Sequence, residues 1–84
     1  MNTKMNDSKS KVEIAEQLRA FAQNPVYIFA IASIEGLGEL GGADAVNHIE
    51  ELMDLEADKD GPNGKEKWAA LLRAYGRAGR FLPK

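Results

Sequence analysis

The chain has 84 residues, of which 44% are hydrophobic and 29% are charged, and its formal net charge at pH 7 is −2. A chain of this length can bury one modest hydrophobic core, so we expect a single domain. The absence of cysteine excludes a disulfide scaffold, a thiol nucleophile and any metal centre with thiolate ligands.

The chain begins with a polar segment, residues 1–9, which we expect to be a flexible tail in front of one helical domain at residues 10–84. No apolar stretch of signal-peptide length follows this tail. The longest apolar run, residues 26–34, is about half as long as a membrane span. We therefore expect a cytoplasmic protein with no membrane segment.

The first predicted helix covers residues 11–23. Ser10 and Glu13 have the spacing of a capping box, in which each side chain accepts a hydrogen bond from the backbone N–H of the other residue. The apolar positions that follow recur at helical spacing: Ile14, Ala15, Leu18, Phe21 and Ala22. Asn24 and Pro25 are typical of an N-cap and a first helical position, so they end this helix and start the next element.

The second element, PVYIFAIASIE (residues 25–35), combines strand-favouring residues with an apolar run that has no clear period. A strand needs a partner, and no other segment has the alternating or β-branched pattern of a second strand. We therefore predict a short, fully buried helix at the centre of a bundle, ending at Gly36 or Gly38 in a glycine C-cap. Leu37 and Leu40 should fill the core from the turn that follows.

Two further helices complete the predicted bundle. In residues 43–57 the apolar side chains fall on one helical face and the acidic side chains on the opposite face. Residues 58–64, DKDGPNG, form a loop by composition. The last helix, residues 65–78, should turn its large side chains inward: Trp68, Leu71, Leu72 and Tyr75. Phe81 and Leu82 should fold back onto the core. The predicted fold is all-α, a compact bundle of about four short helices around a buried central second helix.

Gly36, Gly38 and Gly41 have the G-x-G-x-x-G spacing of the dinucleotide-binding fingerprint. That fingerprint needs a second parallel strand after the helix, and here a loop and another helix follow. Glu39, between the glycines, would also repel a phosphate group. We therefore predict no nucleotide site and no cofactor, and interpret the glycines as a tight turn between the second and third helices.

No metal or catalytic site is predicted either. Glu56, Asp58 and Asp60 have the spacing of the first ligands of a calcium loop, but Lys67 occupies the twelfth position, where a bidentate glutamate belongs. His48 is the only histidine, which is too few for zinc in a chain without cysteine, and no recognisable nucleophile accompanies it. We interpret His48 as a partly exposed surface residue and expect that the protein is not an enzyme.

Charge is distributed unevenly along the chain. Residues 35–60 contain nine acids and one lysine, whereas residues 65–84 contain six bases and one glutamate. A stripe of carboxylates on a helix can imitate a phosphate backbone and steer the protein towards a basic groove. The residues that we expect to bind a partner lie on this acidic helix: Asp44, Glu50, Glu51, Asp54 and Asp58.

These features predict a non-enzymatic protein-binding module, a small inhibitor or adaptor whose acidic helix docks on a basic surface of a nucleic-acid-processing protein. We expect the type that phages and plasmids encode against host defence, such as an anti-CRISPR-like inhibitor. Two alternatives remain open: a homodimer in which the acidic face meets a basic stripe of the other subunit, and direct binding of nucleic acid by that stripe. A pI of about 5.3 counts against the second alternative. The basic stripe consists of Arg73, Arg77 and Arg80.

Overall fold

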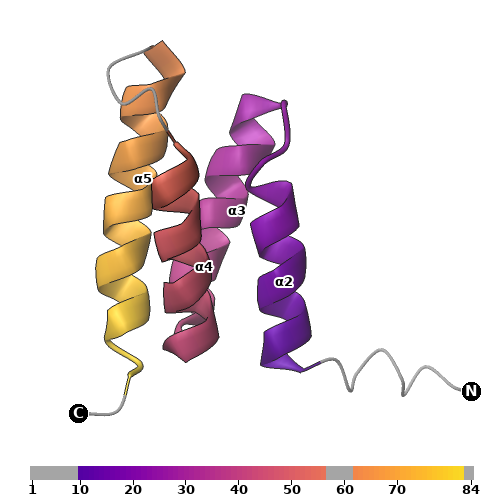
Figure 1. The fold of residues 1–84 in the computed structure, drawn as a ribbon, viewed down its shortest axis with the longest axis vertical. Helices are drawn as coiled ribbons and strands as arrows, with labels where there is room; N and C mark the ends of the chain where they lie inside the picture. Colours follow the sequence, from indigo (N-terminus) through magenta and orange to yellow (C-terminus); the bar gives the residue numbers. More distant parts are fainter. Residues whose placement is uncertain (1–9, 57–61, 83–84) are drawn as a thin grey trace, which may run out of the picture.

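The structure is a computed structural model, and it describes residues 10–56 and 62–82 (Figure 1). The predicted tail at residues 1–9 lies outside the described residues. The described part consists of four helices and no strand: α2 (Lys11–Phe21), α3 (Tyr27–Leu40), α4 (Gly42–Leu55) and α5 (Pro62–Gly79). The helices run alternately up and down (Figure 1).

The helices α3 and α4 occupy the centre of the bundle. Each of them contacts all three other helices, whereas α2 and α5 do not contact each other and flank the central pair (Figure 1). The prediction of an all-α bundle with a central second helix is confirmed. In the described part of the chain, no helix is both long and apolar enough to cross a lipid bilayer.

The predicted capping box at the start of α2 is present. Ser10 Oγ accepts a hydrogen bond from the backbone N–H of Glu13 at 3.2 Å, and Glu13 Oε1 accepts one from the backbone N–H of Ser10 at 2.9 Å. The helix ends at Phe21, two residues earlier than predicted. Asn24 is not the N-cap of the next helix, since α3 begins after Val26, whose N–H donates to Asn24 Oδ1 at 2.8 Å.

The prediction that the second helix ends at Gly36 or Gly38 is wrong, because α3 continues through both glycines to Leu40. The turn is confined to Gly41 and Gly42, whose φ angles of 70° and 92° lie in the region that favours glycine. Each glycine inside a helix costs about 1 kcal/mol relative to alanine. Packing offsets this cost, since the fully buried Leu37 lies between the two glycines.

The glycine spacing therefore serves helix packing. A Cβ atom on Gly38 would lie 2.8 Å from the Cα atom of Ala74 in α5, so only glycine allows this approach. The ring of Phe81 lies against Gly41, where a Cβ atom would be 2.1 Å from a ring carbon. Phe81 thus folds back towards the bundle as expected, although its side chain remains 56% exposed.

The core is built mainly from small and aliphatic residues. Its largest fully buried side chains come from three helices: Ile34, Leu37, Ile49 and Leu71. The apolar face predicted for residues 43–57 is confirmed, since Ala45, Ile49 and Leu52 are buried. Although α3 is central, its outer side is exposed, because Ile28 and Phe29 are 67% and 52% accessible. The helix is therefore not buried along its full length.

The inward orientation predicted for Leu72 and Tyr75 is wrong. Leu72 is 57% exposed and Tyr75 is 38% exposed, while Trp68 is partly buried. The reason is that α5 packs through a row of small residues spaced four apart, all of them buried: Ala70, Ala74 and Ala78. Leu72 projects about 160° from the middle of this row, so its side chain points away from the core.

Candidate functional site

The acidic side of α4 forms an exposed row of carboxylates. We define the acidic face as four exposed residues of α4: Asp44, Glu50, Glu51 and Asp54. They lie opposite the buried apolar residues of the same helix, as the helical period predicts. The fifth predicted binding residue, Asp58, lies outside the described residues, and so does Asp60 of the rejected calcium loop.

Glu51 is held in place from two directions. Arg19 Nε of α2 donates a hydrogen bond to Glu51 Oε1 at 2.8 Å, and His48 Nδ1 lies 3.4 Å from the same oxygen. Both contacts favour the charged carboxylate, so His48 and then Arg19 lower the pKa of Glu51 below its ordinary value of 4.5. His48 is partly exposed and its side chain contacts a carboxylate, not a nucleophile.

Glu50 is fixed by a neutral partner. The hydroxyl of Tyr75 in α5 donates a hydrogen bond to Glu50 Oε2 at 2.7 Å. This hydrogen bond, and then the negative charge of Glu50, raise the pKa of Tyr75 above its ordinary value. This contact also explains why Tyr75 lies on the surface, because its hydroxyl bridges α5 to the acidic face.

Asp44 and Asp54 stay open to solvent. Both are exposed, and within residues 10–56 and 62–82 neither forms a hydrogen bond or an ion pair through its side chain. Asp44 lies in the first turn of α4, where a carboxylate interacts favourably with the helix dipole. The acidic face thus combines two oriented carboxylates with two that have no partner in the described part.

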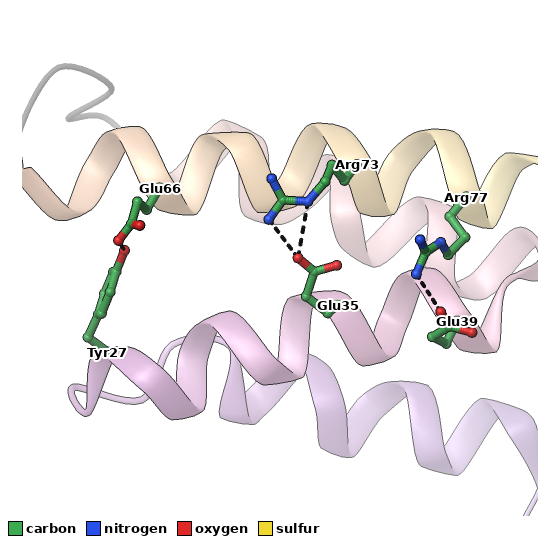
Figure 2. A network of polar contacts seen from close by, with 6 residues as sticks. All are labelled: Tyr27, Glu35, Glu39, Glu66, Arg73 and Arg77. Carbon is green, nitrogen blue, oxygen red and sulfur yellow. Dashed lines mark hydrogen bonds and ion pairs between the residues drawn. The ribbon is translucent and has the colours of Figure 1, made fainter.

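The basic stripe on α5 is largely used inside the molecule. Arg73 Nη2 lies 2.7 Å from Glu35 Oε2 of α3, and Arg77 forms an ion pair with Glu39 one turn further along (Figure 2). Arg80 is exposed and its side chain forms no ion pair with the described residues. Two of the three predicted arginines are therefore turned towards α3.

A third contact continues this row towards the start of α3. The hydroxyl of Tyr27 donates a hydrogen bond to Glu66 of α5, which raises the pKa of Tyr27 to about 12 (Figure 2). Beside this hydrogen bond, a groove of about 330 Å³ lies on the surface between α3 and α5. Its lining residues are Tyr27, Ile28, Ile31, Glu66, Ala69 and Arg73.

Sequence reasoning missed the pairing of α3 with α5. The signal was present, because Glu35 and Glu39 are four residues apart and so are Arg73 and Arg77. Matching spacing on two helices permits a ladder of ion pairs, but only if the helices are neighbours in a suitable register. The sequence by itself does not establish which helices are neighbours.

Comparison with protein-family models, with curated proteins and with solved structures found no match for this chain. The described residues contain no group of three or more histidine, aspartate or glutamate side chains placed to hold a metal ion. On the described surface, α4 presents four exposed carboxylates.

Proposed function

We propose that the protein is a non-enzymatic binding module whose acidic face on α4 docks on a basic surface of a nucleic-acid-processing protein. The observation that carries this proposal is the unequal pairing of the two charged surfaces. Two of the three arginines of the basic stripe, Arg73 and Arg77, are compensated by glutamates of α3, and within the described residues only Arg80 is not. On the acidic face, Asp44 and Asp54 have no compensating charge in the described part. A basic partner would supply it.

The oriented carboxylates also support this function. Glu50 and Glu51 are each held by a side chain from a neighbouring helix, Tyr75 and Arg19 respectively. Side chains that are already fixed lose little conformational entropy on binding, so more of the interaction energy appears as affinity. A row of exposed carboxylates also accelerates encounter with a positively charged groove.

The biological type that fits these properties is a small cytoplasmic inhibitor or adaptor of the kind that phages and plasmids encode, for example an anti-CRISPR-like inhibitor. Such a protein would occupy a groove that normally binds the phosphates of nucleic acid. Direct nucleic-acid binding through α5 is less well supported, because Arg73 and Arg77 would first have to leave their glutamate partners.

The experiment uses the immobilised chain to capture proteins from the cytosol of the native host at moderate salt. A captured protein is purified, and its association rate is measured against wild type and a variant with Asp44→Asn, Glu50→Gln and Asp54→Asn. We expect the association rate of this variant to fall about tenfold and to depend less on salt. Duplex DNA should compete with the wild-type chain for the partner.

The matched control removes the same number of negative charges from the other three helices: Glu16→Gln, Glu39→Gln and Glu66→Gln. Net charge changes equally in the two variants, although the control also removes the partners of Arg77 and Tyr27. We expect this control to associate within about twofold of the wild-type rate. Equal loss in both variants, or capture that duplex DNA does not affect, would contradict the proposal.

A further inference from the structure

The molecule has a second exposed surface on the side away from the acidic face. In Figure 1, α3 lies behind α4, and Figure 2 looks onto α3 and α5 from that rear side. We define the α3–α5 face as the exposed outer sides of these two helices together with the groove between them. At its apolar end, Ile28 is 67% exposed beside the groove, and Ala32 one turn later is exposed.

The other end of the α3–α5 face carries two parallel rows of opposite charge. The glutamates Glu35 and Glu39 form the row on α3, and the arginines Arg73 and Arg77 form the row on α5 (Figure 2). The pairs are not enclosed, since the side chains of Arg73 and Glu35 are 58% and 33% exposed and those of Arg77 and Glu39 are 42% and 68% exposed. Each charge can therefore interact with a second partner.

We propose that a second copy of this chain packs on the α3–α5 face, about a two-fold axis parallel to the helices. This symmetry places α3 of each copy over α5 of the other, at the same height along the bundle. Glu35 then faces Arg73 of the second copy, and Glu39 faces Arg77 of the second copy. At the apolar end, Ile28 of each copy meets the groove of the other.

Charge complementarity selects this arrangement. A two-fold axis across the helices would instead lay α3 on α3 in opposite directions and bring Glu39 near the apolar residue Ile28 of the other copy. Burying a carboxylate against an apolar side chain without a partner is unfavourable. A foreign partner of one charge sign would be repelled by one of the two rows, whereas a second copy complements both.

The expected dimer is a weak one. The face is two helices wide and about 20 Å long, so two copies would bury roughly 1,000 Å² in total, which is the lower end of specific interfaces. It uses a different surface from the acidic face on α4, so both surfaces can be occupied together. It also differs from a dimer in which the acidic face meets the arginines.

The first test is sedimentation equilibrium of the full chain between about 1 and 100 μM. We expect the mass to rise from 9.2 kDa towards twice that value, and Ile28→Asp to weaken dimerisation at least tenfold. Val12→Asp is the matched control, since Val12 is likewise exposed, at 46%, and is likewise the second residue of its helix. An aspartate at the second residue of a helix interacts favourably with the helix dipole in both variants. Circular dichroism checks that both variants are folded.

The second test exchanges charges between copies. Glu35→Arg alone and Arg73→Glu alone should each weaken self-association, because like charges then face each other. An equimolar mixture of the two variants should restore dimers, because the introduced arginine of one chain faces the introduced glutamate of the other. In the same mixed dimer, the unchanged Arg73 of the first chain faces the unchanged Glu35 of the second.

A chain that stays monomeric over this range overturns the proposal, even if Ile28 binds a different protein. The proposal is also overturned if Val12→Asp weakens dimerisation as much as Ile28→Asp does. A mixture of the two charge variants that stays monomeric would overturn it as well.

Discussion

Gly38, near the C-terminal end of α3, lies directly against Ala74 in the second half of α5, and a Cβ atom at Gly38 would be 2.8 Å from the Cα atom of Ala74. The obstacle is backbone, not the end of a flexible side chain, so it cannot move aside without shifting a helix. This contact sets the distance between α3 and α5. The two ion pairs flank this contact, since Gly38 lies between Glu35 and Glu39 in α3 and Ala74 lies between Arg73 and Arg77 in α5.

The substitution Gly38→Ala should therefore destabilise the protein by about 1–2 kcal/mol. Overpacking costs about 1–3 kcal/mol, and the gain in helix propensity returns up to about 1 kcal/mol. Gly76→Ala is the matched control, because an added Cβ atom there meets nothing within 4 Å. It should stabilise the protein by up to about 1 kcal/mol. Urea unfolding measures the free energy of unfolding of both variants. If Gly38→Ala were as stable as the wild-type protein, the close contact between Gly38 and Ala74 would be contradicted.

The contact between Tyr27 and Glu66 predicts a loss of stability at alkaline pH. The pKa of Tyr27 rises from 10.0 to about 12, because its hydroxyl donates to the Glu66 carboxylate. The folded state thus favours the neutral phenol. The resulting stabilisation is fully present below pH 10 and is lost as pH rises from 10 to about 12.

The variant Tyr27→Phe should lack this loss of stability between pH 10 and 12. Ultraviolet titration of tyrosinate in the folded protein gives a direct reading. The component near pH 12 should disappear in Tyr27→Phe and persist in Tyr75→Phe. If Tyr27 ionises near pH 10 in the folded wild-type protein, its hydroxyl does not donate to Glu66.

The lowered pKa of Glu51 predicts a loss of stability at acid pH. Its pKa is lowered from 4.5 by His48 and then by Arg19, so the folded state favours the carboxylate. The stabilisation is present above pH 4.5 and is lost as pH falls through the lower pKa of the folded protein. The stability difference between wild type and Glu51→Gln should therefore shrink as pH falls below 4.5.

Nuclear magnetic resonance titration of the Glu51 carboxyl group checks this prediction. The midpoint should lie below 4.5 in the folded protein and should rise in Arg19→Gln, where one of the two favourable contacts is lost. A midpoint at 4.5 in wild type would show that neither contact holds the carboxylate in solution. The acidic face would then lack one of its oriented members.

Much of the fold was predictable because its signals are local. The capping box at Ser10 links residues only three apart, and the apolar face of α4 repeats with the helical period. The exposure of the carboxylates on α4 follows from the same period, since a helix that buries Ile49 must turn Asp54 outward. These features require no knowledge of the neighbouring helices.

The sequence by itself determined an all-α chain with one amphipathic acidic helix, because hydrogen bonds and side-chain periodicity within a helix depend on residues at most a few positions apart. Only the tertiary structure decided that α3 continues through Gly36 and Gly38, and that Arg73 pairs with Glu35, 38 residues away. Packing of two helices is specified by shapes that meet only after folding. The choice of which charges are compensated, and hence which surface remains open to a partner, depends on that packing.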